Sequence, residues 1–176
     1  PTETVYGLGA NALNEDAARK IYAAKGRPLR QSSDCPYFLY GGAGAAGEGD
    51  SGSRKKAGGG ILAGPADNGF SKKRDCPLWN NRRLDTVAVR MPSDPIAGRL
   101  IALSGVPIAA PSANTSGRPS PTTAQHVWQD MNGKIEMILD GGPVGIGVES
   151  TIVDVSGPVP VLLHPGAVTM EMLEAV

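Results

Sequence analysis

The sequence predicts one α/β domain. Short apolar runs, which are typical of buried strands, alternate along the chain with segments in which apolar residues recur at helical spacing. A chain of 176 residues is long enough for one domain with a hydrophobic core. One apolar run, at residues 106–110, leads into small hydroxyl and amide side chains separated by glycine and proline. In an open α/β sheet, a ligand site forms in this way at the carboxyl end of a strand.

The first predicted element is a helix that begins after Asn14. This residue is a suitable N-cap, and two acidic side chains follow it in the first turn. Gly26 interrupts the helix, and Pro28 prevents its continuation. The residues at helical spacing are Ala17, Ile21, Tyr22 and Ala24.

Three further helices are predicted in the second half of the chain, each after a residue suited to be an N-cap. The caps are Asp94, which Pro95 follows, Thr122 and Thr169. The first two helices are expected to run to Leu103 and to about Met131. The last is expected to be amphipathic, with Met170, Leu173 and Val176. Predicted strands cover residues 86–90, 106–110, 135–139, 151–155 and 159–163.

Residues 29–83 differ from the rest of the chain. Residues 41–60 contain nine glycines and almost no large apolar residue, and neither a helical nor a strand period is present. Such a segment buries too little apolar surface to offset the entropy lost on ordering it. A structureless stretch of this length is unusual inside a compact domain.

Composition and charge exclude several classes of protein. The formal net charge is zero and the isoelectric point is about 7.2, so no overall field attracts nucleic acid or membrane, although a local basic cleft stays open. We find no apolar run that could span a bilayer and no signal-peptide pattern. Cys35 and Cys76 have no disulfide or metal spacing. We therefore expect a soluble cytoplasmic protein with no metal site of its own.

Residues 109–122 are the most informative segment, because small polar side chains can approach a ligand closely and hydrogen-bond it without adding charge. A surface loop rich in proline and serine is the alternative interpretation of the same residues.

Five segments, which occur in one order, together resemble the YrdC family of threonylcarbamoyl-AMP synthases. They include Lys-Gly-Arg-Pro at residues 25–28 and Ser-Ala-Asn-Thr-Ser-Gly-Arg-Pro at residues 112–119, and they cover residues 1–9, 25–28, 84–92, 109–122 and 147–154. The resemblance implies a YrdC-like twisted open mixed sheet with flanking helices, within a single domain over residues 1–176. It also implies a strand and a helix ahead of Pro1, so we expect the chain to be incomplete at its N-terminus.

Residues 29–83 do not resemble the family as they stand, but a different reading frame of the same segment can resemble it. Residues 29–39, back-translated with permitted codons and read one nucleotide along, can encode the family's usual continuation after Lys-Gly-Arg-Pro. Residues 61–69, read with the same shift, can encode a strand entry similar to that of the family. Our hypothesis is that residues 29–83 are translated in a shifted frame between two compensating indels, or are disordered. A genuine lineage-specific insert is the alternative.

The resemblance implies a reaction in which L-threonine, bicarbonate or CO2, and ATP give threonylcarbamoyl-AMP and pyrophosphate. A carbamate formed on the threonine amine would attack the α-phosphorus, so no protein nucleophile is required, and Mg2+ is expected with ATP. Catalysis would depend on positioning and on charge stabilisation. The product would pass to the machinery that modifies tRNA, and contact with tRNA or another double-stranded RNA is a further expectation.

Four residues are expected to be catalytic: Lys25, Arg27, Ser112 and Asn114. Two cations separated by one glycine can reach one triphosphate, and arginine can hold phosphate oxygens through two hydrogen bonds. Basic residues that complement the dipole at a helix end are the alternative explanation. The resemblance pairs this Lys-x-Arg with Ser112 and Asn114, whose side chains would hydrogen-bond phosphate or ribose oxygens.

The resemblance implies additional ATP contacts from Thr86, Ala110, Ser120 and His164. His164 stands where the family usually has arginine, and a neutral imidazole would hold phosphate oxygens less strongly. Turn or surface roles are assigned to Ser116, Arg118 and His126.

Four residues are expected to bind threonine: Thr2, Thr4, Arg90 and Ser150. In an extended segment, Thr2 and Thr4 would point to one face and Glu3 to the other. Arg90 would bind a carboxylate or a phosphate, and the alternative is a surface arginine at a strand end. An edge hydroxyl is the alternative for Ser150.

Two other functions stay open. One is an RNA-binding module without synthase activity, although residues 84–176 have few aromatic residues interleaved with Lys and Arg. The other is an inactive frameshifted product. If the shifted-frame hypothesis holds, we expect the chain to be weakly stable and nearly inactive, because the shifted residues would otherwise supply a core strand and site contacts.

Overall fold

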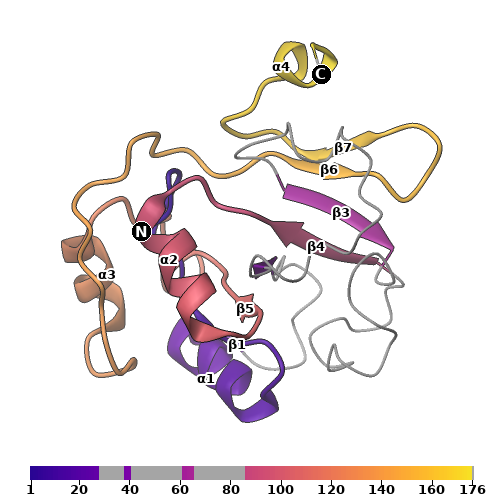
Figure 1. Ribbon diagram of the computed structural model, residues 1–176. Helices are drawn as coiled ribbons and strands as arrows, with labels where there is room; N and C mark the ends of the chain where they lie inside the picture. Colours follow the sequence, from indigo (N-terminus) through magenta and orange to yellow (C-terminus); the bar gives the residue numbers. More distant parts are fainter. Residues whose placement is uncertain (28–37, 41–60, 66–85, 176) are drawn as a thin grey trace.

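The computed structural model describes residues 1–27, 38–40, 61–65 and 86–175, which form seven strands and four helices (Figure 1). The helices are α1 (Glu15–Lys25), α2 (Pro95–Ser104), α3 (Ala124–Met131) and α4 (Met170–Glu174). The strands are β1 (Ala10–Asn11), β2 (Phe38–Tyr40), β3 (Ile61–Pro65), β4 (Thr86–Arg90), β5 (Ile108–Ala109), β6 (Ile152–Asp154) and β7 (Val161–His164).

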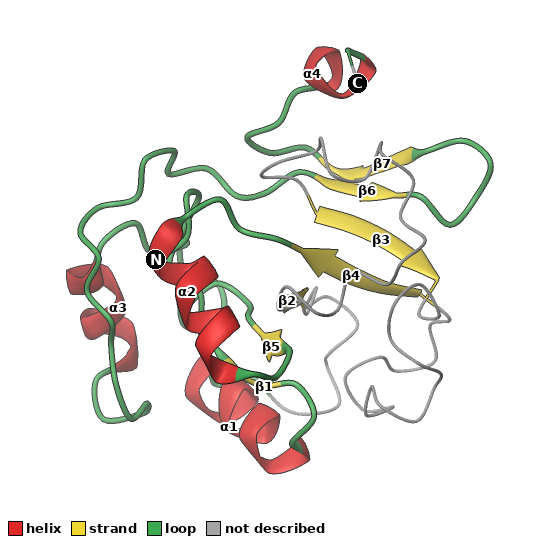
Figure 2. Ribbon diagram, in the orientation of Figure 1, coloured by secondary structure: helices red, strands yellow, loops and turns green. Residues whose placement is uncertain are grey.

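The strands form one mixed sheet in the order β1-β5-β2-β4-β3-β6-β7. Strand β2 runs parallel to β4 and β3 parallel to β6, whereas the other neighbouring strands are antiparallel. Helices α1, α2 and α3 gather at the β1–β5 end of the sheet, and α4 lies beyond β7 at the other end (Figure 2). The expected open mixed sheet with flanking helices is therefore confirmed.

Helix α1 begins and ends as the sequence predicts. The Asn14 side chain accepts the Ala17 N–H at 3.0 Å, and Gly26 adopts a φ of 66°, in the left-handed region that favours glycine. The Arg27 N–H then donates to the Tyr22 carbonyl at 3.0 Å. This cap fixes one cation, Lys25, on the last turn of α1 and a second, Arg27, directly after it.

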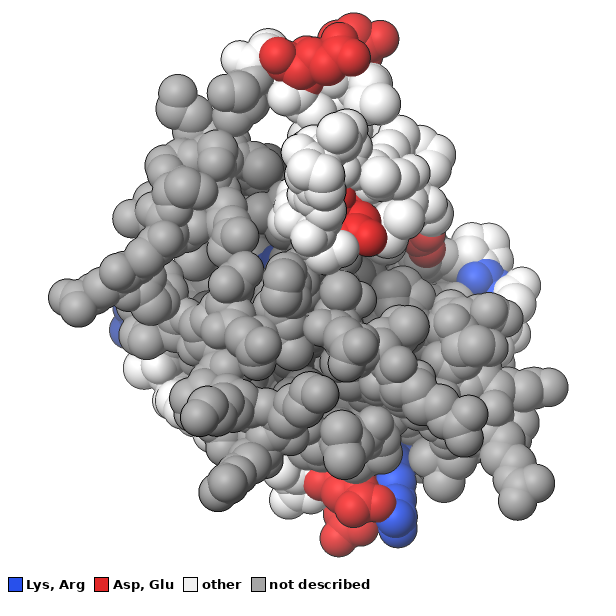
Figure 3. Space-filling view, turned by 90° about the vertical axis from the view of Figure 1, so that its right-hand side faces the viewer, with Lys and Arg blue, Asp and Glu red and all other residues white. Residues whose placement is uncertain are grey.

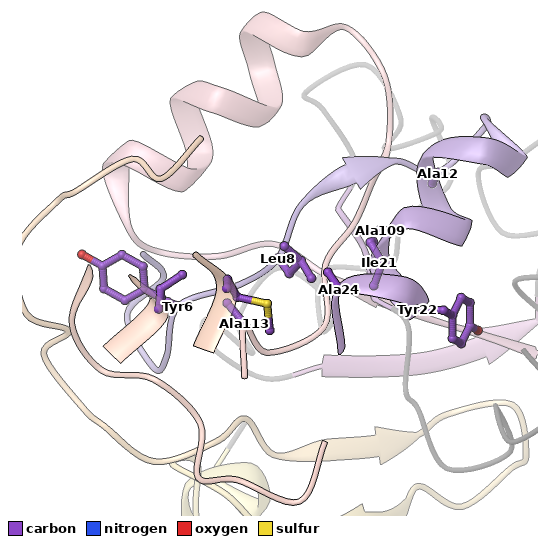
Figure 4. Packing of buried hydrophobic residues seen from close by; sticks show 10 residues of the cluster. Tyr6, Leu8, Ala12, Ile21, Tyr22, Ala24, Ala109 and Ala113 are labelled. Carbon is purple, nitrogen blue, oxygen red and sulfur yellow. The ribbon is translucent and has the colours of Figure 1, made fainter. Parts of the chain in front are cut away.

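The main hydrophobic core joins the N-terminal residues, α1, β5 and α3 (Figure 4). Several of its members are alanines, which allow the backbone of residues 109–113 to approach α1 closely. The buried residues of this core are Tyr6, Leu8, Ala12, Ile21, Tyr22, Ala24, Ala109, Ala113, Val127 and Met131.

Two predictions of local structure in the second half of the chain are wrong in detail, and a third, for the last helix, is confirmed. Strand β5 covers only Ile108–Ala109, because Pro107 and Pro111 flank it and lack a donor for a strand ladder. The N-cap of α3 is Thr123 rather than Thr122, since the Thr123 side chain accepts the His126 N–H. The last helix, α4, forms with Thr169 as its N-cap, as predicted, although none of its described residues is fully buried.

The predicted strand at residues 135–139 is not formed. Ile135 and Ile138 pack against the main core without joining the sheet, whereas Met137 is exposed. Helix α3 ends where its C-cap, Asn132, leaves the helical conformation at a ψ of 129°, and Gly133 then turns the chain at a φ of 73°. The apolar run at residues 135–139 therefore packs against the core and does not pair as a strand.

Within residues 29–83 the structure describes only the backbone of β2 and β3. These two strands overlap the two windows in which the shifted frame restores family-like sequence. The remainder of this segment lies outside the described residues, so the shifted-frame hypothesis stays a prediction. Among the described residues, no helix is long and apolar enough to cross a membrane.

Candidate functional site

The N-terminal residues bring two distant segments together. The Tyr6 N–H donates to the Pro121 carbonyl at 2.8 Å, and the Ala113 N–H donates to the Tyr6 carbonyl at 2.9 Å. On the other side, the Gly147 N–H donates to the Thr4 carbonyl at 3.0 Å. Residues 2–6 therefore lie between the segment after β5 and the segment before β6, which both carry predicted site residues.

Lys25, Ser112 and Asn114 form the first polar cluster, which we call the Lys25 group. The Lys25 side chain is buried, with 3% of the residue exposed. Its Nζ donates to the Ser112 carbonyl, to the Asn114 carbonyl at 2.8 Å and to Asn114 Oδ1 at 3.4 Å. Ser112 Oγ donates to the same Asn114 Oδ1 at 2.6 Å. Lys25, Ser112 and Asn114, three of the residues that the sequence predicts to be catalytic, are therefore in contact.

Arg27 adjoins this group through Ser116. Arg27 Nε donates to Ser116 Oγ, and the Ser116 N–H donates to the Lys25 carbonyl at 3.1 Å. Ser116 lies in a turn, as predicted, and it also ties the loop of residues 112–118 to the end of α1. Arg118 is also more than a solvated charge, since it pairs with Asp130 although 59% of its side chain is exposed. The third residue assigned to the surface, His126, is indeed exposed.

Thr2, Thr4, Arg90 and Ser150 form a second polar cluster, which we call the Arg90 group. Arg90 is 4% exposed, and its Nη2 donates to Thr4 Oγ1 at 3.0 Å and lies 3.5 Å from Thr2 Oγ1. The two threonine hydroxyls are 3.1 Å apart, and Ser150 Oγ lies 3.5 Å from Thr4 Oγ1. The structure therefore brings together all four residues predicted to bind threonine, and Arg90 is not a surface residue.

Glu3 also belongs to this group, and sequence reasoning missed it. The chain bends at residues 3–5, where an extended segment was expected, and the Thr2 N–H donates to the Val5 carbonyl at 3.1 Å. Glu3 consequently forms an ion pair with Arg90 and does not point away from it. Its other carboxylate oxygen accepts the Ser93 N–H at 3.1 Å.

The Arg90 guanidinium changes the acidity of Glu3. Burial by itself raises the pKa of Glu3, but the hydrogen bond and charge of Arg90, together with the Asp94 backbone N–H, outweigh burial. The pKa of Glu3 therefore lies below its ordinary value of 4.5. Arg90 Nε is buried and has no hydrogen-bond partner among the described residues, so this group keeps one unsatisfied donor.

Ser120 and His164 meet at Glu149, which the sequence did not single out. Ser120 Oγ donates to Glu149 Oε1 at 2.5 Å, and His164 Nε2 lies 3.8 Å from Glu149 Oε2. His164 Nδ1 is 3.3 Å from the Ser150 carbonyl, which places this trio beside the Arg90 group. The predicted contact of Ser120 and His164 with ATP stays a prediction.

The side chains of Ala110 and Thr86, the other two residues predicted to contact ATP, do not test that prediction. Ala110 packs in a small apolar cluster with Ile101 and Ile108, where only its backbone can serve a ligand. The Thr86 side chain lies outside the described part of the chain, although its backbone is the first residue of β4. A cavity of about 510 Å³ between α3 and residues 132–140 is lined by none of the predicted site residues.

The chain is similar to a protein family, to curated relatives and to solved structures. The Sua5/YciO/YrdC family model, described as telomere recombination, matches residues 1–34 and 61–166. A threonylcarbamoyl-AMP synthase of Bacillus subtilis is 48% identical over 194 aligned residues, covering 100% of this chain and 51% of its own length. A second, of Pyrococcus abyssi, is 47% identical and is covered over 52% of its length.

A crystal structure of Sua5 from Pyrococcus abyssi, complexed with L-threonine, superposes with a TM-score of 0.85 at 47% identity. The match covers 99% of this chain and 52% of that one. The chain thus spans about half the length of the relatives it matches. Because the family model matches most of the chain, the chain belongs to the Sua5/YciO/YrdC family.

Proposed function

We propose that this domain carries the chemistry of a threonylcarbamoyl-AMP synthase, a nucleotidyltransferase that joins L-threonine, bicarbonate or CO2, and ATP. The observation that carries the proposal is a cluster in which Thr2 and Thr4 contact Arg90 and Ser150 contacts Thr4. The buried Nε of Arg90 still lacks an acceptor among the described residues. The relatives named threonylcarbamoyl-AMP synthase and the Sua5 complex with L-threonine support the same assignment.

The Arg90 group is the proposed threonine site. A carboxylate accepts hydrogen bonds from a guanidinium in a charge-assisted geometry, and it would satisfy the Nε donor. The neighbouring hydroxyls of Thr4 and Ser150 can hydrogen-bond the amine or hydroxyl of the amino acid. Because Glu3 already offsets part of the Arg90 charge, the ligand does not have to neutralise the whole guanidinium.

The Lys25 group is the proposed site for the phosphates of ATP. Lys25 and Arg27 would stabilise charge on the triphosphate as the threonine carbamate attacks the α-phosphorus and pyrophosphate leaves. Ser112 Oγ and the Asn114 amide would orient phosphate or ribose oxygens. Thr86, Ala110, Ser120 and His164 are proposed as additional contacts with the nucleotide.

Mg2+ is proposed to accompany ATP, held by phosphate oxygens and water as this ion prefers. Within the described ranges no group of three or more His, Cys, Asp or Glu side chains could hold a metal ion. We place the activity in the cytoplasm, where the adenylate would pass to the machinery that modifies tRNA.

An RNA-binding module without synthase activity is the alternative. Figure 3 shows charges of both signs on the described part of one face, with acidic atoms over α4 and acidic and basic atoms side by side over α1. Several basic side chains in the described part are paired with carboxylates, as in Arg19–Glu15 and Lys20–Glu136. Mixed, paired charges are a poor electrostatic footprint for a nucleic-acid backbone.

The activity of the chain as it stands depends on residues 29–83. The family model leaves residues 35–60 unmatched but resumes at residue 61, so it does not decide between a shifted frame and an insert. We propose that the chain with this segment returned to the family frame, called the restored chain, turns over faster than the present chain. Resequencing of the gene for indels flanking this segment tests the frame independently.

The experiment is the release of pyrophosphate with L-threonine, bicarbonate and ATP, measured for both chains and with each substrate omitted in turn. We expect release in the restored chain that requires all three substrates, and little in the present chain. Equal, robust turnover by the present chain would reject the shifted frame. Release that is independent of L-threonine, or none from either chain, would contradict the synthase assignment.

A further inference from the structure

Asp130 is a buried carboxylate on the core-facing side of α3. Its neighbours on that side, Val127 and Met131, are both buried in the main core, and Asp130 itself is 9% exposed. A carboxylate in such a place is destabilising unless hydrogen bonds and opposite charge compensate for the water it loses. The position of its partners therefore shows what this side chain holds in place.

Among the described residues, the partners of the Asp130 carboxylate belong to the loop of residues 112–118. One carboxylate oxygen accepts the Thr115 N–H at 2.9 Å, and the other forms the ion pair with Arg118. Lys134 Nζ donates to the Asp130 main-chain carbonyl at 2.7 Å, which strengthens the same junction. The carboxylate therefore contacts the loop at Thr115 and at Arg118, which are three residues apart.

Asn114 is fixed by the two residues that Asp130 holds. Its Nδ2 donates to the Arg118 carbonyl at 2.7 Å and to the Thr115 carbonyl at 3.1 Å. These two bonds determine which way the amide faces, so that Oδ1 is presented to Ser112 Oγ and Lys25 Nζ. A movement of the Thr115 peptide would therefore change the position of the amide oxygen and of the Lys25 ammonium.

We propose that Asp130 is a positioning residue for the nucleotide side of the site. It acts through the Thr115 N–H on Asn114 and, through Asn114, on Lys25, and it does not itself contact ATP. The inference rests on the proposed function of the Lys25 group. It assigns no role to Asp130 in holding threonine, because its described contacts lie within residues 115–118 and Lys134.

Three variants separate this role from a merely structural one. Asp130→Ala removes both contacts. Asp130→Asn keeps an oxygen that can accept the Thr115 N–H but cannot pair with Arg118. Arg118→Ala, the matched control, removes the ion pair while leaving the Arg118 carbonyl that Asn114 uses.

The first measurement is steady-state turnover of the restored chain together with the Kd for ATP in both chains. For Asp130→Ala we expect a fall in kcat of about 100-fold and a weaker affinity for ATP, with the KM for L-threonine unchanged. Asp130→Asn should recover most of the loss. Arg118→Ala should stay within about twofold of the parent, because it keeps the Thr115 N–H bond to Asp130 and the Arg118 carbonyl that holds Asn114. A rise in the KM for L-threonine equal to the loss for ATP, or no recovery by Asp130→Asn, would overturn the proposal.

The second measurement, amide hydrogen exchange at Thr115, needs no ligand. We expect protection in the parent and in Asp130→Asn, and faster exchange in Asp130→Ala while the amides of α1 stay protected. Unchanged exchange at Thr115 in Asp130→Ala would overturn the proposal. A restored chain that binds no ATP would instead contradict the proposed function, and Thr115 exchange would then decide the role of Asp130 alone.

Discussion

The two polar groups of the site hold their buried cations in different ways. Lys25 Nζ donates to neutral oxygens of Ser112 and Asn114, which orient the ammonium without cancelling its charge. Arg90, by contrast, is paired with the carboxylate of Glu3 and surrounded by hydroxyls. The Lys25 ammonium keeps its full charge, which suits a highly charged triphosphate. The charge of the Arg90 guanidinium is partly offset by Glu3, which suits a single carboxylate.

The contrast also separates what each group contributes to stability. Removing one partner of a buried ion pair leaves the other charge buried and uncompensated, so the Arg90 group is tightly coupled to folding. The Lys25 group consists largely of hydrogen bonds from one side chain to a loop, and a lost bond there mainly changes the geometry of that loop. Loss of the Arg90–Glu3 ion pair should therefore act mainly on folding, whereas loss of one hydrogen bond in the Lys25 group should act mainly on binding.

The largest expected effect follows from Arg90→Met. Glu3, whose side chain is only 13% exposed, would lose its charge partner, and the free energy of unfolding should fall by about 3–5 kcal/mol. Urea unfolding measures this loss, and the double variant Glu3→Gln/Arg90→Met should be less destabilised than Arg90→Met alone. Arg19→Met is the control, since the Arg19–Glu15 pair is about half exposed and should contribute below about 0.5 kcal/mol. Equal losses of unfolding free energy in Arg90→Met and Arg19→Met would show that the Arg90–Glu3 pair contributes no more to stability than an exposed pair.

Asn114→Ala tests the other group. The variant removes the acceptor shared by Lys25 and Ser112, and the affinity for ATP should weaken by about 2 kcal/mol, which is roughly 30-fold in Kd. The Kd for L-threonine, measured by calorimetry on the restored chain, should change little. A loss of threonine affinity of the same size would show that the groups are not separate.

Gly166→Ala should disturb the Arg90 group without changing any of its side chains. A Cβ at residue 166 would collide with the backbone of residues 149–151, including Thr151 N at 2.5 Å, and would displace Ser150. We expect about 1–2 kcal/mol of destabilisation and a weaker affinity for L-threonine. Gly98→Ala in α2 is the matched control, because its Cβ would meet nothing within 4 Å and should be neutral or stabilising. Destabilisation of the same size in both variants would refute this steric account.

The smallest predicted effect is a dependence of stability on pH. The pKa of Glu3 is below 4.5 in the folded chain, so its contribution is present above that pH and is lost as the pH falls through the folded value. Urea unfolding of the parent and of Glu3→Gln should differ most at neutral pH, and the difference should narrow below about pH 4. A difference that stays constant down to pH 3 would argue against the ion pair.

Local sequence chemistry predicted the elements that carry the site, because their ends depend on neighbouring residues. Asn14 and Gly26 define α1 through a side-chain cap and a positive φ, and both are visible as residue types. The strand predicted at residues 135–139 failed because an apolar run does not indicate whether its partner is a core or another strand. Tertiary packing decides whether such a run packs against a core or pairs with another strand.

The missed site residues share a similar cause. Glu3 reaches Arg90 only because residues 3–5 bend, and nothing in their composition distinguishes this bend from an extended segment. Asp130 had a weak signal, one carboxylate between the apolar Val127 and Met131 on a predicted helix. A charged residue on the buried face of an amphipathic helix implies a buried partner, but the sequence does not identify it.

The most direct test of the account is a crossed titration on the restored chain, with L-threonine and ATP each titrated into the parent, Ser150→Ala and Asn114→Ala. We predict that Ser150→Ala weakens the binding of L-threonine while leaving ATP close to the parent, and that Asn114→Ala does the reverse. Equal losses of both ligands in each variant, or the opposite pairing, would contradict the division of the site into an Arg90 group for threonine and a Lys25 group for the triphosphate.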